Sequence, residues 1–91
     1  MQFEWDENKA RRNEIKHHIR FEDAVLIFED PFRIEAVDKQ HSRECEMRYK
    51  TIGFVDDVLF VVYTERRERI RIISARLATP RERRAYYDGN L

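Results

Sequence analysis

The chain has 91 residues, 40% of them charged and 42% hydrophobic, and its 18 basic residues balance its 18 acidic residues at pH 7. This length suits one domain, and aromatic and β-branched residues along the whole chain argue against disorder. The lone cysteine, Cys45, excludes an internal disulfide, no apolar run approaches the ~20 residues of a membrane span, and the acidic N-terminus is not a signal peptide. We expect a single cytoplasmic domain over residues 1–91.

The first third of the sequence predicts a strand and two helices. Apolar and charged residues alternate over residues 3–5, which is typical of a short strand. Asp6 can then cap a helix over residues 7–18. Apolar residues recur at helical spacing in a second helix, which Asp30-Pro31 ends. These residues are Phe21, Ala24, Val25 and Phe28.

After Pro31 the apolar period becomes that of strands. We expect strands at residues 32–37, 46–54, 58–63 and 69–76, a polar loop at 38–44 and a turn near 66–68. Thr79, Pro80 and Glu82 have the spacing of a capping box with proline at the first helical position, and predict a final helix. The expected α+β fold is a short strand, two helices, a four-stranded antiparallel meander and a C-terminal helix. The first two helices would cover one sheet face and leave the other largely open.

The charge is distributed unevenly. Residues 64–85 contain eight arginines and three glutamates, a balance of +5, whereas the rest of the chain has ten basic and fifteen acidic residues. A basic pole on a neutral chain points to a polyanionic partner. Arginine's planar fork of donors suits bidentate contact with phosphate.

Several chemistries have little support. His17, His18 and His41 lack the paired spacing of a zinc site, and the acidic residues form no EF-hand loop, so we expect neither metal nor other cofactor. Neither serine lies in a glycine-flanked nucleophile elbow, and two glycines cannot build a phosphate-cradling loop.

Cleavage of RNA by its own 2′-hydroxyl remains possible, because it requires a base, an acid and cationic donors on the phosphate. The candidate phosphate ligands are Arg66, Arg71, Arg76, Arg81 and Arg84, with Arg67 beside them. Tyr63 and Tyr86 are candidates for base stacking or proton transfer, and Lys9, His17, Lys50 and Glu65 are further candidates.

Each candidate also has a purely structural interpretation. Arginines that alternate with isoleucines are often the solvated face of a strand, and Tyr63 at the end of an apolar run fits a half-buried packing position. His17 can interact with the negative end of its helix, and Lys9 can pair with acidic neighbours. Arg71 and Ile72 must face opposite sides of the sheet, so the eight arginines cannot all share one RNA.

With Phe3-Glu4-Trp5-Asp6 at its start, Lys16-His17 at the end of the first helix and Ile70-Arg71-Ile72-Ile73-Ser74-Ala75-Arg76 near its end, the sequence resembles the BrnT toxins of type II toxin–antitoxin systems over residues 3–87. The most specific parts of the resemblance are the first-helix spacing that ends in Lys16-His17 and residues 70–76. Further matching residues are Phe3, Trp5, Lys9, Asn13, Phe21, Ala24, Phe28, Pro31, His41, Ser42, Gly53, residues 59–66, Arg81, Glu82, Arg83, Arg84 and Tyr86.

The resemblance implies a RelE-like fold and a metal-independent endoribonuclease that slows translation. It also implies a ribbon-helix-helix antitoxin that forms a heterotetramer with two toxins, and contact with operator DNA only through that complex. In these toxins glycine usually follows the Lys-His pair; His18 stands there instead and must adopt a left-handed backbone or end the helix otherwise. Arg20 replaces a serine that commonly caps the second helix.

The leading hypothesis is therefore a ribonuclease toxin whose arginines bind RNA phosphate, with Glu65, Tyr63, Lys50 or His17 in proton transfer. The alternative is a non-catalytic module that binds nucleic acid or protein through the same basic surface.

Overall fold

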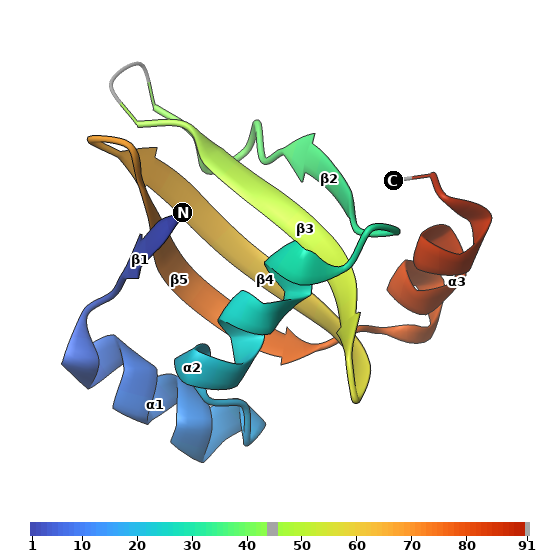
Figure 1. Ribbon diagram of the computed structural model, residues 1–91, viewed down its shortest axis with the longest axis horizontal. Coiled ribbons are helices and arrows are strands. Elements are labelled where there is room, and N and C mark those ends of the chain that lie inside the picture. The colour runs from blue at the N-terminus through green and yellow to red at the C-terminus, as the bar shows by residue number, and fades with distance from the viewer. Residues whose placement is uncertain (44–45, 91) are drawn as a thin grey trace.

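The computed structural model describes residues 1–43 and 46–90, and within them the chain forms one sheet and a few short helices (Figure 1). The strands are β1 Gln2–Glu4, β2 Ile34–Val37, β3 Arg48–Val55, β4 Asp57–Arg66 and β5 Arg69–Leu77. The helices are α1 Glu7–His17, α2 Phe21–Ala24, the 3-10 helix η1 Val25–Glu29, and α3 Pro80–Asp88. No helix in this part of the chain is long and apolar enough to cross a membrane.

The sheet has the strand order β1-β5-β4-β3-β2. Strands β2 to β5 pair antiparallel with their sequence neighbours, which confirms the predicted meander and the α+β fold class. β1 pairs in parallel with the start of β5 and closes that edge. The central strand β4 is buried at Leu59, Val61 and Tyr63 on the face that α2 and η1 cover. Phe60 and Val62 on the other face are only half-buried, so its unbroken apolar run overstates the cover on that face.

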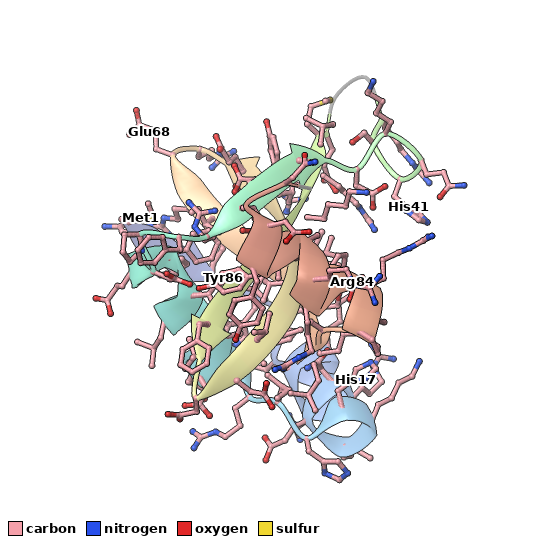
Figure 2. All side chains as sticks on the ribbon, turned by 90° about the vertical axis from the view of Figure 1, so that its right-hand side faces the viewer. Met1, His17, His41, Glu68, Arg84 and Tyr86 are labelled. Carbon is pink, nitrogen blue, oxygen red and sulfur yellow. The ribbon has the colours of Figure 1, made fainter. Side chains whose placement is uncertain are left out.

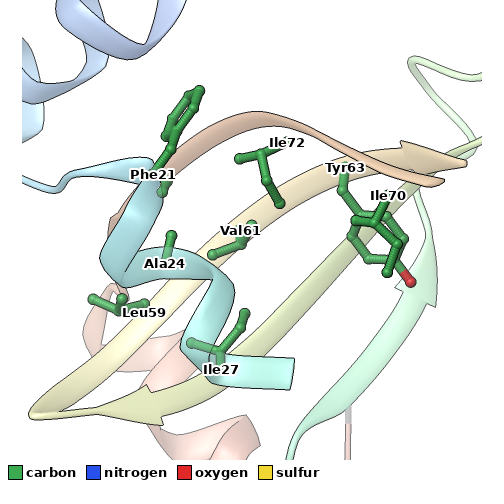
Figure 3. Close-up of a cluster of buried hydrophobic side chains, with 9 residues drawn as sticks. Phe21, Ala24, Ile27, Leu59, Val61, Tyr63, Ile70 and Ile72 are labelled. Atoms are coloured by element: carbon green, nitrogen blue, oxygen red, sulfur yellow. The ribbon is translucent and has the colours of Figure 1, made fainter. Parts of the chain in front are cut away.

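The main core lies between the sheet and the segment formed by α2 and η1 (Figure 3). Phe21, Ala24 and Ile27 are fully buried and pack against β4 and β5. Their spacing of three residues matches a 3-10 turn, so the predicted helix over residues 21–28 continues past Ala24 as η1 and not as an α-helix. Gly53 permits this close packing, because a Cβ there would lie 2.9 Å from the Cβ of Ile27.

The ends of α1 are formed as the sequence predicts. Asp6 Oδ1 accepts hydrogen bonds from the N–H groups of Asn8 and Lys9 at 2.8 and 3.0 Å. His18 adopts the left-handed backbone, with φ of 59° and ψ of 26°, that glycine usually provides at this position. Arg20 precedes α2 and makes no side-chain cap hydrogen bond.

A buried amide holds α1 against β5. Asn13 Nδ2 donates to the carbonyl oxygens of Ile19 and Ala75 at 3.0 and 2.8 Å, and its Oδ1 accepts from Ala75 N–H at 3.0 Å. The side chain thus pairs with the edge of β5 beyond β1, where the backbone groups of Ala75 would otherwise lack partners. These hydrogen bonds hold α1 beside Ala75, near the end of β5.

The second sheet face is less open than the sequence predicts, because α3 covers one end of it. Tyr86 packs there in a smaller cluster with Ile52 and Val58. Its hydroxyl donates to Asp30 Oδ2 at 2.5 Å, and burial followed by this bond raises the pKa of Tyr86 to about 12. Asp30 Oδ2 also accepts from Phe54 N–H at 2.8 Å, so one carboxylate joins α3, β3 and the end of η1.

Several predicted boundaries shift. β2 begins at Ile34 because Phe32 lies in the preceding turn with its side chain 76% exposed. The predicted strand 46–54 begins at Arg48, and β4 extends three residues beyond the predicted end. The predicted turn near residues 66–68 is confirmed, with positive φ at Arg67 and Glu68. The predicted loop starts at Asp38; its last residue, Glu44, and the following Cys45 lie outside the described residues.

We expect Tyr86→Phe to lower the free energy of unfolding by about 2 kcal/mol, because it removes a hydrogen bond to a carboxylate. Tyr87→Phe is the matched control, since Tyr87 is the neighbouring ring and is 65% exposed. Urea unfolding of both variants measures the effect. Equal losses in the two variants would show that the Tyr86 hydroxyl does not anchor α3.

Candidate functional site

The candidate site lies on the sheet face that α3 partly covers, and a bulge in β5 determines which arginines reach it. Val62 pairs with Ser74 but Tyr63 pairs with Ile72, so Ile73 is an additional residue in β5. Without it, Arg71 and Arg76 would point to opposite faces, because they are five residues apart. With it, they pair with Thr64 and Phe60, whose side chains share a face. The bulge therefore places Arg71 and Arg76 on the same side of the sheet.

The centre of this face is apolar and its borders are cationic. Lys50, Val62 and Ser74 occupy one row across β3, β4 and β5, and adjacent strands are about 4.8 Å apart. Phe60 and Arg76 occupy the next row. A cavity of about 410 Å³ opens between β3, β4 and α3. It is lined by Lys50, Phe60, Arg81, Glu82 and Ala85.

Arg76 is held rigidly in this site. Its Nη1 and Nη2 donate to the two carboxylate oxygens of Glu82 at 2.7 and 3.0 Å, and its guanidinium lies 4.2 Å from the centre of the Phe60 ring. Glu82 also completes the predicted capping box, because its Oε1 accepts from Thr79 N–H while its own N–H donates to Thr79 Oγ1. One carboxylate thus starts α3 and orients Arg76.

The charge of Glu82 is maintained despite its position. Burial acts to raise its pKa, but the hydrogen bonds from Arg76 and Thr79 N–H outweigh burial and lower the pKa overall. Glu82 is therefore an anion at neutral pH within a ring of cations. Glu82 borders the same cavity as Lys50 and Arg81.

Two other predicted phosphate ligands are paired with acidic side chains. Arg71 Nη1 lies 2.9 Å from Glu4 Oε2, and Arg66 Nη2 lies 3.2 Å from Glu46 Oε2. Both arginines are farther than Arg76 from the cavity along their strands. Within the described residues Lys50, Arg81 and Arg84 make no ion pair, so their charges are more available to a ligand.

Three predicted site residues lie elsewhere. Tyr63 is 3% exposed on the helix-covered face, where it stacks on Tyr49 and donates to Glu35. Burial, followed by that hydrogen bond, raises the pKa of Tyr63 above its ordinary value. Glu65 lies on the same face of β4 as Tyr63. Tyr86 is 9% exposed, on the side of α3 that packs against the sheet. None of the three side chains meets Lys50 and Arg76, because strand alternation or burial separates them.

The remaining predicted residues surround the site or lie beyond it. Arg84 is exposed on α3 and His17 ends α1 on the same side of the molecule (Figure 2). Burial, then the positive charges of Lys16 and Arg76, lowers the pKa of His17. Arg67 lies at the tip of the β4–β5 hairpin, and Lys9 lies on α1.

The bulge at Ile73, the link from Glu82 to Arg76 and the hydrogen bonds of Asn13 were not predicted. The capping box identified Glu82, but only the fold places Arg76 beside it. No group of three or more His, Cys, Asp or Glu residues in the described ranges could hold a metal ion.

An aromatic ring and ordered cations on an exposed sheet face form a site of the kind that phosphate-containing polymers fit. A scan against protein families matches residues 5–82 to the ribonuclease toxin BrnT of type II toxin–antitoxin systems. The chain belongs to this family, so it is a ribonuclease toxin and has a cognate antitoxin as partner.

A solved structure shows the same fold. The crystal structure of the Brucella abortus ribonuclease toxin BrnT superposes with a TM-score of 0.62 at 24% sequence identity, over 87% of this chain and 97% of that one. A search of curated proteins found no match.

The ion pair between Glu82 and Arg76 should make stability depend on pH. The pKa of Glu82 is lowered on folding, so its contribution is present above the unfolded-state pKa and is lost as pH falls through the folded-state pKa. We expect Glu82→Gln to destabilise the protein at pH 7 and the difference from wild type to shrink towards pH 3. Urea unfolding of both proteins at several pH values measures the difference in their free energies of unfolding. A difference that does not change with pH would contradict an ionic contribution of Glu82.

Proposed function

We propose that this toxin cleaves single-stranded RNA in the cytoplasm without a metal ion and thereby inhibits translation, and that the cavity between β3, β4 and α3 holds the phosphodiester that is cut. The observation that supports this most directly is the fixed guanidinium of Arg76 over Phe60, in the row of the sheet next to the row of Lys50, Val62 and Ser74. Lys50 and Arg81, which line the cavity, would approach one phosphate from β3 and α3, and Arg76, held by Glu82 and Phe60 of the cavity wall, would be a third donor. Arg84 would contact an adjacent phosphate.

In the proposed reaction the RNA's 2′-oxygen attacks the neighbouring phosphorus, and the bond from phosphorus to the 5′-oxygen breaks. The proton of the 2′-hydroxyl passes to a base, and the departing 5′-oxygen receives a proton from an acid. Cationic donors stabilise the negative charge that builds up on the phosphate oxygens. Phe60 supplies an aromatic surface against which a base can stack beside Arg76.

Of the four proton-transfer candidates, His17 and Lys50 lie on the side of Arg76. His17 is suited to act as base, because its lowered pKa keeps the imidazole neutral at pH 7. Lys50 is suited to donate to the leaving oxygen or to the phosphate. Tyr63 and Glu65 have no part in the proposed site. Tyr86 anchors α3 to the sheet.

The antitoxin is proposed to be a ribbon-helix-helix protein that forms a heterotetramer with two toxins and carries them to operator DNA. The same basic surface could instead bind nucleic acid without cutting it. No contact in the site favours that alternative, and cations on three elements around one cavity wall, Lys50, Arg76 and Arg81, suit charge stabilisation during cleavage.

We expect Lys50→Gln to reduce the rate of cleavage of a defined single-stranded RNA by about 10²-fold or more. Removal of one donor from other charge-stabilising sites has an effect of this size. Lys39→Gln is the matched control, because Lys39 is exposed in the loop after β2. The products should end in a 2′,3′-cyclic phosphate or 3′-phosphate, and EDTA should leave the rate unchanged. A 3′-hydroxyl end would contradict attack by the 2′-hydroxyl, and intact RNA after prolonged incubation would support binding without cleavage.

The pH dependence of cleavage tests the base. If neutral His17 accepts the proton, kcat/KM should fall as pH decreases through a pKa below its ordinary value of about 6.5. His17→Gln should lower the rate and remove this acidic limb, while His41→Gln, on an exposed loop residue, should keep it. An acidic limb that persists in the His17 variant would assign the base to another residue.

A further inference from the structure

One side of α1 carries three cations that the cleavage site described above does not use. Lys9, Arg12 and Lys16 are exposed and follow one another at i, i+3 and i+7, so they lie along about 10 Å of helix. They line a cavity of about 230 Å³ together with Asn13, His17, Ile73 and Ser74. We call Lys9, Arg12 and Lys16 the α1 cation face.

The rest of α1 has a different charge pattern. Arg11 and Glu14 line a separate cavity on the other side of the helix, where acidic and basic groups are mixed. Within the described residues, none of the three cations of the α1 cation face forms an ion pair. Like charges at i, i+3 and i, i+4 destabilise a helix by a few tenths of a kcal/mol per pair. The attraction of Lys9 for Asp6 and the place of Lys16 in the last helical turn offset part of this cost, but no such interaction is present for Arg12 in the described residues.

The α1 cation face is continuous with the proposed cleavage site. Ser74 lines its cavity and also stands in the row of Lys50 and Val62. Arg76 lies two residues further along β5, and its charge reaches His17, whose pKa it helps to lower after burial and Lys16. The hydrogen bonds from Asn13 to Ala75 hold α1 beside this part of β5. Figure 2 shows His17 and Arg84 along one side of the molecule.

The chemistry of this face suits phosphate better than a protein. The centres of protein interfaces are depleted in lysine and rich in aromatic residues, whereas Ile73 is the one apolar side chain among the cavity's lining residues. The Ser74 hydroxyl adds a hydrogen-bond donor between the cations and Arg76.

We propose that the α1 cation face is a second phosphate-binding site, which holds the RNA backbone on one side of the phosphodiester that is cut. This inference rests on the proposed function and extends it: the substrate is a single-stranded segment several nucleotides long, which runs from α1 over Ser74 and Arg76 to α3. Lys9 then binds RNA away from the reacting phosphate, and Arg12 and Lys16 join it.

The salt dependence of RNA binding tests this site. The probe is a fluorescent 12-nucleotide RNA with 2′-O-methyl groups throughout, which removes the attacking hydroxyl and prevents cleavage. For single strands, the slope of log affinity against log salt concentration changes by about 0.7 for each phosphate contact. We expect Arg12→Gln/Lys16→Gln to reduce the slope by about 1.4 and to weaken binding at least roughly tenfold at 0.1 M salt.

Arg11→Gln is the matched control, because it removes one adjacent positive charge from the same helix but on the other side. It should keep the wild-type slope. The double variant should also melt close to the wild-type temperature, because relief of repulsion between Arg12 and Lys16 offsets the loss of a cation from the last turn of α1. Binding loss with unchanged or raised melting temperature distinguishes a binding site from a structural role.

Three outcomes would overturn the inference: an unchanged slope in the double variant, an equal slope change in Arg11→Gln, or weaker antitoxin binding with unchanged RNA binding, which would identify a protein-docking surface. Cleavage by the wild type on unmodified RNA is scored separately. A wild type that binds with the expected slopes but never cuts RNA would support the second phosphate site and contradict the proposed cleavage site.

Discussion

The whole functional face depends on one additional residue in β5. Ile73 shifts the pairing with β4, so that Arg71, Ser74 and Arg76 all point away from the main core. The same shift keeps Ile72 and Ala75 on the buried side, where they pack with the segment formed by α2 and η1. Without the additional residue, strand alternation would invert both patterns beyond Ile73, with Ala75 turned away from the core and Arg76 turned towards it. The bulge therefore lets one strand keep its apolar residues in the core and its polar residues on the proposed phosphate-binding face.

Stability and function share the same groups at α3. Glu82 caps the helix and binds Arg76, while Arg76 lies over Phe60 at the edge of the cluster that contains Tyr86. An arginine held in this way loses little conformational freedom when it meets a phosphate. The cost is that its charge is partly neutralised by Glu82 before RNA arrives. The nearby cations Lys50 and Arg81 compensate for that loss, because neither forms an ion pair within the described residues.

Local signals in the sequence predicted most of the elements. Capping residues at Asp6 and Thr79, the change of apolar period after Pro31 and the left-handed requirement at His18 each act within a few residues, so they can be read without the fold. The family resemblance raised the arginine-rich region from a charge anomaly to a candidate site. The bulge could not be predicted, because nothing in residues 69–76 marks Ile73 as unpaired. Local signals could not decide between a site role and a packing role for Tyr63, because its contacts with Tyr49 and Glu35 form only through strand pairing.

The neutral net charge conceals a separation of charge that the fold creates in three dimensions. Acidic residues of the chain bind particular arginines: Glu4 pairs with Arg71, and Asp57 pairs with Arg83 at 2.6 Å. Several cations that are unpaired within the described residues come from segments far apart in sequence and border one side of the sheet: Lys9, Arg12 and Lys16 on α1, Lys50 on β3, and Arg81 and Arg84 on α3. Net charge therefore says little about how this protein meets RNA. What matters is which basic residues have an acidic partner. An arginine in an ion pair has part of its charge neutralised, whereas an unpaired cation still offers its charge to a phosphate.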